Sequence, residues 1–168
     1  MNTSQIEIQA RRISDSRGDA TVEVEVRLGG VSAIGRAPAG KTKGGDEART
    51  APVDAAIASV REVIEPLARR AKVDLASHAG LIALERALIE RAGPNCRDLG
   101  ANALLPVSIG LWRTAATLQG LELYLGAFGI KTGAPQPEAD FPDPSTWVRR
   151  RKYLRLCAIE AREAILSA

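Results

Sequence analysis

Aromatic residues are scarce in this sequence, making up 4% of its 168 residues. Proteins that bind single-stranded nucleic acid stack bases on aromatic side chains, so this composition argues against that class. The formal net charge of +3 comes from interspersed basic and acidic residues and is too small to indicate a nucleic-acid partner by itself. We therefore expect no nucleic-acid partner.

Histidine and cysteine are nearly absent as well. His78 is the single histidine, and the two cysteines, Cys96 and Cys157, lie far apart. This set disfavours zinc sites and Ser-His-Asp hydrolysis, which need clusters of such residues. No targeting segment is recognisable at the N-terminus, and no apolar run approaches the roughly 20 residues that cross a bilayer. We expect a reduced, cytoplasmic protein that does not enter a membrane.

The first part of the sequence has the pattern of β-strands. Apolar residues alternate with polar ones from Ile6 to Ala10 and from Val22 to Leu28, which is typical of strands with one buried face. The tight turn "LGG" leads into a third apolar segment, "VSAIG", and "DSRGDAT" forms a longer turn before the second strand. The pattern predicts an antiparallel meander of three strands.

The period then changes to that of helices. Val53, Ile57, Val60, Ile64 and Leu67 form one apolar face, and Pro52 suits the first turn of that helix. A second helix has Leu81, Leu84 and Leu88 and stops at Gly93 and Pro94. A third has Leu104, Val107, Leu111, Ala115 and Leu118 and ends at Gly120, and the short segment "LELYLGAFG" follows.

A proline-rich segment separates this part from the C-terminus. We interpret 1–129 as one domain, 130–147 as a linker or arm, and 148–168 as a basic amphipathic helix. The helix begins with the basic run Arg149 to Lys152, joined by Arg155. It presents either an ordinary solvated face, a docking surface anchored by Trp147 and Tyr153, or a weak contact with nucleic acid.

The segment "GRAPAGKT", from Gly35 to Thr42, matches the pattern of a phosphate-binding P-loop. A P-loop lies between a parallel strand and a helix that starts at its Lys-Ser/Thr pair. Here Gly44 and Gly45 follow almost at once, and glycines in a first helical turn cost roughly 1 kcal/mol each. We expect hairpin strands before the segment and a helix only from about Pro52, so we reject the P-loop interpretation.

Three motifs instead resemble the N-terminal domain of enolase, the lyase that dehydrates 2-phosphoglycerate. They are "DSRGDATVEVEV", "RAPAGKTKGGDEA" and "LGANALLPVSIGLWRTAA", and they occur in the family's order within about Ile6 to Gly129. The resemblance implies an α+β fold: a three-stranded antiparallel meander followed by a helical subdomain. The C-terminal arm and helix match nothing in that family.

The resemblance also gives the glycine-rich segment a role. In enolases this segment is a mobile lid over the substrate, and one of its serines helps to hold a magnesium ion. Thr42 stands at that serine, and Gly40 and Gly44 are retained, whereas Lys41 and Lys43 replace uncharged residues. The loop 38–46 is either a solvated surface loop or a grip for an anionic or phosphorylated ligand, made of backbone amides and two ammonium groups.

The catalytic barrel of enolases, with its magnesium ligands and base lysine, has no counterpart before Ala168. We expect no enolase activity from this chain alone, because enolate formation needs the metals and a positioned base. No cofactor is expected for the chain alone, and Mg²⁺ at Thr42 is expected only if a partner barrel supplies the other ligands.

The turn before the second strand and the second strand itself contain further candidate site residues. Arg17 in the turn "DSRG" either pairs with Asp15 or joins Gly40, Lys41, Thr42, Lys43 and Gly44 in binding a ligand. Glu23 and Glu25 alternate with core residues and predict an acidic face on the sheet. In the enolase family that face meets the barrel and the neighbouring subunit.

Three functions remain open at this point. The first is a module that works by association, as a homo-oligomer or with a protein partner, and whose loop contacts an anionic ligand. The second is an enzyme acting on a phosphorylated or carboxylated small molecule, with Lys41 or Lys43 as a catalytic group at a subunit interface. The third is the lid half of a split enolase that a separately encoded barrel completes.

Overall fold

The computed structural model of the chain describes residues 1–15, 17–37 and 48–120. A short 3-10 helix, η1 (Thr3–Gln5), leads into strand β1 (Glu7–Ser14), which is followed by β2 (Ala20–Leu28) and β3 (Val31–Arg36). The strands form one antiparallel sheet in the order β1-β2-β3. Glu23 in β2 lies opposite Arg11 in β1 and Arg36 in β3. The predicted meander is confirmed.

The hairpin between β2 and β3 has a two-residue turn. Gly29 and Gly30 both have positive φ angles, 60° and 82°. Turns of this kind match the right-handed twist of the two strands, and glycine adopts them without a side-chain penalty. The pair of glycines in the sequence therefore fixes the register of this hairpin.

Helices follow the sheet in the predicted order. The first helical segment consists of α1 (Val53–Ser59), the π-helix η2 (Val60–Ile64) and α2 (Glu65–Ala71). Next come α3 (His78–Ala92), the 3-10 turn η3 (Pro94–Cys96) and α4 (Ala101–Leu118). Gly93, at the end of α3, has a φ of 71° and ends the helix as expected.

The first helical segment differs from the regular helix that the sequence predicts. A π-helix interrupts it, and the backbone N–H of Glu65 bonds to the carbonyl of Val60, five residues earlier. Pro66 follows at once and has no N–H to donate, so a widened turn before it replaces the regular hydrogen-bond pattern. The fully buried face consists of Ala56, Val60, Ile64 and Ala68.

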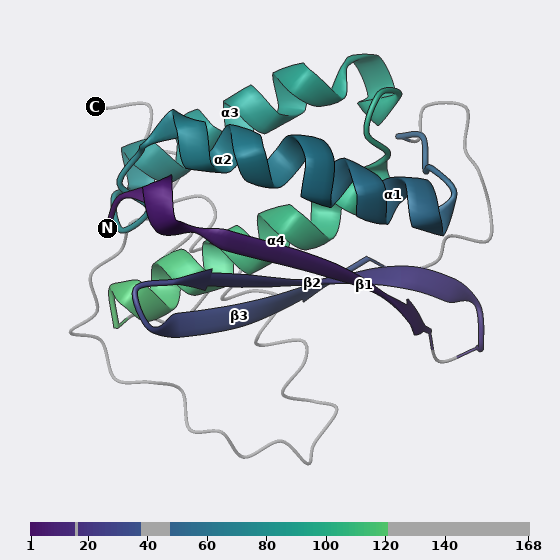
Figure 1. The fold of residues 1–168 in the computed structure, drawn as a ribbon, viewed down its shortest axis with the longest axis horizontal. Coiled ribbons are helices and arrows are strands. Elements are labelled where there is room, and N and C mark those ends of the chain that lie inside the picture. The colour runs from purple at the N-terminus through teal and green to yellow at the C-terminus, as the bar shows by residue number, and fades with distance from the viewer. Residues whose placement is uncertain (16, 38–47, 121–168) are drawn as a thin grey trace, which may run out of the picture. The chain divides into compact units, whose positions relative to one another are not determined.

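The helices cover one face of the sheet and leave the other uncovered by any described element (Figure 1). The even-numbered positions of β2 from Val22 to Leu28 face the helices and are buried. Their partners in the core come from α1, η2, α3 and α4. This arrangement leaves Thr21, Glu23, Glu25 and Arg27 on the uncovered face, as the period of two requires.

The sheet packs directly on α4. A Cβ atom at Gly110 of α4 would lie 2.7 Å from Cγ2 of Val26. The hydroxyl of Thr114 in α4 donates to the Val26 carbonyl at 3.3 Å. Small residues on α4 therefore set the distance between the helix and the sheet.

The predicted segment 121–129, the linker 130–147 and the helix 148–168 lie outside the described residues. None of the described helices combines the length and the apolar character that a membrane span requires.

Candidate functional site

The loop 38–46 leaves the sheet at a fixed point. The hydroxyl of Thr21 in β2 donates to the carbonyl of Ala37 at 2.7 Å. The Ala37 N–H bonds to the Val22 carbonyl at 3.2 Å. Both Thr21 and Ala37 are buried. These contacts hold the last described residue before the loop against β2.

The chain is fixed again just beyond the loop. The side chain of Asn102 accepts a hydrogen bond from the Ala51 N–H and donates one to the Ala51 carbonyl, both at 2.8 Å. The Arg49 N–H donates to the Asn95 carbonyl, and the Ala101 N–H donates to the Arg49 carbonyl. The start of α4 thus binds the segment that returns from the loop.

Beside the start of the loop, two arginines share one buried carboxylate. Arg11 Nε donates to one oxygen of Glu23 at 2.6 Å, and Arg36 Nε donates to the other at 2.5 Å. The side chain of Glu23 is only 3% exposed, while those of Arg11 and Arg36 are 71% and 63% exposed. The cluster carries one net positive charge because two guanidinium groups face one carboxylate.

The environment of Glu23 keeps it ionised. Burial raises the pKa of the Glu23 carboxyl, but the hydrogen bonds and charges of Arg36 and Arg11 outweigh burial, and the pKa lies below its ordinary value. A buried carboxylate with charge-assisted bonds on both oxygens holds its two partners in place. The two arginines are therefore positioned rather than free to sample many conformations.

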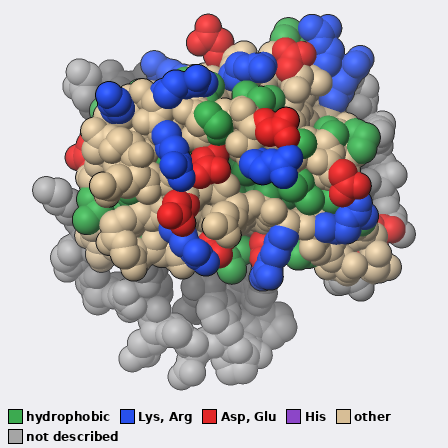
Figure 2. All heavy atoms as spheres, in the orientation of Figure 1, with side chains coloured by type: hydrophobic (Ala, Val, Ile, Leu, Met, Phe, Trp, Pro, Cys, Tyr) green, Lys and Arg blue, Asp and Glu red, His purple; other side chains and the backbone are tan. Residues whose placement is uncertain are grey.

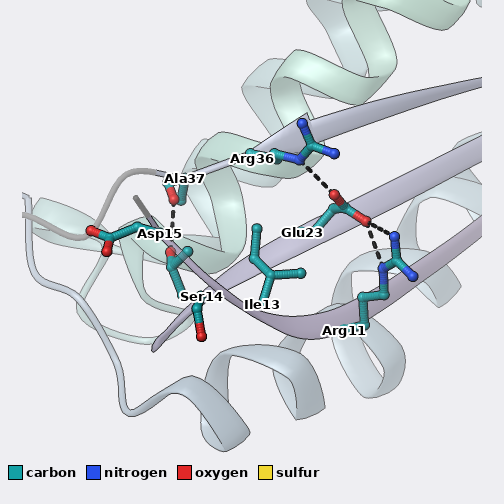
Figure 3. Close-up of a pocket in the computed structure, with 8 residues that line it drawn as sticks. Arg11, Ile13, Ser14, Asp15, Glu23, Arg36 and Ala37 are labelled. Atoms are coloured by element: carbon teal, nitrogen blue, oxygen red, sulfur yellow. Dashed lines mark hydrogen bonds and ion pairs between the residues drawn. The ribbon is translucent and has the colours of Figure 1, made fainter. Parts of the chain in front are cut away.

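These residues form one side of an open hollow of about 640 Å³. Its other lining residues come from the end of β1, the start of β2 and the residue just before the loop: Ile13, Ser14, Asp15, Thr21 and Ala37. Figure 3 shows Glu23 between the two arginines, with Asp15 on the opposite side of the hollow from Arg11. The hollow thus has a basic side, whereas the Asp15 carboxylate on the other side is bound within its own turn.

The prediction of an acidic sheet face is wrong. Glu23 is paired with two arginines, and Glu25 accepts two hydrogen bonds from Arg27 at 2.9 and 2.8 Å. Those bonds, together with the charge of Arg27, outweigh burial and lower the pKa of Glu25. The sequence shows the glutamates alternating along β2, but only the register brings Arg11 and Arg36 beside Glu23.

The charges on the face seen in Figure 2, which includes helices and strands, are also mixed. Figure 2 shows basic and acidic side chains interspersed over the visible face, with no extended area of one sign. Arg12 pairs with Asp54 at 2.8 Å, and Arg69 pairs with Glu65 at 2.7 Å. Such pairs neutralise one another at short range. This face therefore offers no basic tract of the kind that follows a nucleic-acid backbone.

Arg17 has the structural role that was one of its two predicted roles. Its backbone N–H donates to the Asp15 carboxylate at 2.8 Å, and its Nε lies 3.8 Å from the same side chain. Asp15 also accepts from the Asp19 N–H at 2.9 Å. The aspartate closes the turn between β1 and β2, and Arg17 pairs with it.

The loop candidates Gly40, Lys41, Thr42, Lys43 and Gly44 lie outside the described residues. Magnesium at Thr42 is expected only if a partner barrel supplies the other ligands. Within 1–15, 17–37 and 48–120, no group of three or more His, Cys, Asp or Glu side chains gathers in a way that could hold a metal. The Mg²⁺ expected at Thr42 with ligands from a partner barrel therefore stays a prediction.

His78 and Cys96 lie away from the hollow. His78 begins α3, and its ring meets that of Trp112 edge-on at 5.8 Å. Cys96 is a half-buried free thiol in η3. Neither residue lines the hollow.

Sequence reasoning missed Thr21, Asn102, Arg11 and Arg36 as site residues. Thr21 and Asn102 lie inside the quoted motifs "DSRGDATVEVEV" and "LGANALLPVSIG", but their contacts to Ala37 and Ala51 join residues far apart in the chain. The strand alignment was the one signal in the sequence that could have identified the two arginines. Aligning the predicted strands would have placed Arg11 and Arg36 across from Glu23.

The fold and the hollow define the class of this protein: a three-stranded antiparallel sheet with helices on one face and a glycine-rich loop anchored between β3 and α1. A family model described as "Enolase, N-terminal domain" matches residues 6–125. That match covers most of the 168 residues. The chain belongs to the enolase N-terminal domain family.

Proposed function

We propose that this chain is a module that works by association, as an oligomer or with a protein partner, and that the loop 38–46 binds an anionic or phosphorylated ligand at the hollow. One observation carries the proposal. Arg11 and Arg36 lie beside the start of the loop, largely exposed, and are held by a single buried carboxylate. Two guanidinium groups on one carboxylate leave donors and one positive charge for an anion.

The anchored ends of the loop support the same proposal. Thr21 fixes Ala37 before the loop, and Asn102 fixes Ala51 after it. A glycine-rich segment with fixed ends needs less ordering than a free loop to present its backbone amides to a ligand. Lys41 and Lys43 add two ammonium groups to a site whose described side is already basic. The sparse cysteines of the sequence fit a reducing cytoplasm for this module.

Calorimetric titration of the full chain with inorganic phosphate and a panel of phosphorylated and carboxylated small molecules tests the proposal. We expect at least one anion to bind, and we expect Lys41→Ala/Lys43→Ala and Arg11→Ala to weaken binding by about tenfold each, as loss of a charged contact does. Arg70→Ala is the matched control, because Arg70 is an exposed arginine on α2, distant in sequence from the loop.

Two results would reject the proposal. One is a chain that binds none of these anions at millimolar concentration. The other is binding that the loop and Arg11 substitutions leave unchanged while the protein stays folded by circular dichroism.

A further inference from the structure

Helix α3 (His78–Ala92) has a second face that the core does not use. Its core face consists of Leu81, Leu84, Leu88 and Ala92, all buried. Ile82, Glu85, Arg86 and Ile89 lie beside it at intervals of three and four residues, so they form one continuous stripe. We call these four residues the α3 stripe. It combines two isoleucines with one acidic and one basic residue.

Three residues of the α3 stripe lack the partners that such side chains usually have. Ile89 is 56% exposed, which makes it the most exposed large hydrophobic residue of the described chain, and Leu105 of the neighbouring α4 is 45% exposed. Oε1 of Glu85 is buried and has no hydrogen-bond partner within the described residues. Arg86 is exposed and forms no ion pair with any residue that the structure describes. An exposed apolar residue, a buried acceptor atom and an exposed cation, the last two without partners among the described residues, thus lie along one side of α3.

The order of the four residues makes the α3 stripe complementary to itself. At 100° per residue, Ile82 and Ile89 lie on its midline, with Glu85 on one flank and Arg86 on the other. In a parallel pair related by a two-fold axis along the helices, each midline residue meets its own copy and the flanks are exchanged. Ile82 and Ile89 then meet isoleucine, and Glu85 meets Arg86 of the second copy.

The antiparallel arrangement lacks this complementarity. A two-fold axis across the helices keeps each flank on its own side, so Glu85 would meet Glu85 and Arg86 would meet Arg86. Like charges brought together in this way are unfavourable. The charge order therefore selects one of the two symmetric pairings.

We infer that α3 is a homodimer surface, on which the α3 stripe pairs in parallel with the same stripe of a second copy of this chain. This inference rests on the proposed function and names the partner. Glu85 turns out of the boundary between α3 and α4, gives up its hydrogen bond with Ser108 and accepts from Arg86 of the second copy, which gives Oε1 the donor it lacks. Leu105 borders the contact. One helix pair makes a small interface, so we expect dissociation constants in roughly the micromolar range.

Sedimentation velocity of the full chain, from about 1 to 200 µM to span that range, measures the pairing. We expect a reversible monomer–dimer equilibrium that Ile89→Glu and Arg86→Glu each weaken by about tenfold, because they bury or oppose a charge. Arg70→Glu on α2 makes the same charge change at an exposed site and should leave the equilibrium within about twofold. Circular dichroism confirms that each variant is folded.

A disulfide cross-link distinguishes the parallel dimer from the antiparallel dimer and from a dimer that uses another surface. In a Cys96→Ser/Cys157→Ser background, Ile89→Cys lies opposite its own copy in the parallel dimer and should form a disulfide rapidly. In an antiparallel dimer the two positions are about 10 Å apart along the axis and should not react. Arg70→Cys is the control for random collision.

The inference is overturned by a chain that stays monomeric at every concentration, by a dimer indifferent to Arg86→Glu and Ile89→Glu, or by an Ile89→Cys chain that cross-links no faster than Arg70→Cys. Its failure is separable from that of the proposed function. A monomer that binds the anion keeps the ligand site of the proposed function and loses this surface, whereas a dimer that binds no anion keeps this surface and loses that site.

Discussion

Gly35 in β3 and Pro106 in α4 are in such close contact that a Cβ atom on Gly35 would lie 1.8 Å from the Pro106 carbonyl oxygen. The same atom would lie 2.9 Å from the Gly110 backbone nitrogen. No side chain fits at this position without moving the helix away from the sheet. The missing Cβ atom of Gly35 thus allows β3, the strand that leads into the loop 38–46, to lie this close to α4.

Gly35→Ala should therefore destabilise the fold by about 3 kcal/mol or more, because the methyl group meets backbone that cannot move alone. Gly18→Ala is the comparison. Gly18 has a φ of 86° but nothing within 4 Å of the added atom, so only backbone strain of about 1 kcal/mol is expected. Urea unfolding of both variants measures the difference, and equal losses would contradict the close approach.

Because Arg11 and Arg36 share the buried Glu23, we expect their substitutions to have non-additive effects on the free energy of unfolding. Arg11→Ala and Arg36→Ala should each cost about 1 kcal/mol, because the remaining arginine still pairs with the carboxylate. The double variant should cost about 3–5 kcal/mol, since it leaves a buried charge without a partner. A double-mutant cycle by chemical unfolding measures this coupling. Additive losses would show that the two arginines do not share Glu23.

We expect the buried carboxyl group of Glu85 to make the folded state less stable as the pH rises. Burial raises the pKa of its carboxyl, and a hydrogen bond with Ser108 only partly opposes that change. The folded state therefore holds this proton more tightly than the unfolded state, and the contribution to stability is lost as the pH rises through the folded pKa. Glu85→Gln should stabilise the monomer by about 1–3 kcal/mol at pH 7 and much less at pH 4.

Thermal unfolding at both pH values, at concentrations where the chain is monomeric, measures this effect. Glu23→Gln should change stability with the opposite pH dependence, because the pKa of Glu23 is lowered in the folded state. That carboxylate stabilises the fold above its ordinary pKa, and its contribution is lost as the pH falls. A Glu85→Gln variant whose advantage grows toward pH 4 would contradict the account.

Asn102 should couple stability to ligand binding. Asn102→Ala removes both hydrogen bonds to Ala51 and should cost about 2–3 kcal/mol. It should also weaken anion binding, because the far end of the loop 38–46 is released. Asn102→Asp keeps the acceptor for the Ala51 N–H and should lie between wild type and Asn102→Ala. Unfolding and calorimetry measure the two effects, and unchanged anion affinity in a folded Asn102→Ala would separate the loop anchor from the site.

Local patterns were sufficient to predict the sheet and helix order. Each signal determines the conformation of residues close to it in the chain. These signals are the alternation from Val22 to Leu28, the glycine pair at the β2–β3 turn and Gly93 after α3. The π-helix was missed because Pro66 lies within an otherwise regular apolar period, and its effect falls on the preceding turn. Pro106 likewise lies inside α4 without ending it.

The candidate site was harder to predict because its contacts are long-range. Arg11, Glu23 and Arg36 come from three strands, and Asn102 reaches a residue 51 positions earlier. The glutamates alone suggested an acidic face, and only the register shows that arginines pair with them. The loop lysines remain a prediction from the sequence.

A crystal structure of the full chain, grown with a phosphorylated ligand that binds in solution, tests the central claim most directly. The account predicts the anion in the hollow, in contact with Arg11 or Arg36 and with amides or lysines of the loop 38–46. An anion bound elsewhere, with the hollow holding only solvent, would contradict it. Such a result would remove the loop from the function of this enolase N-terminal domain.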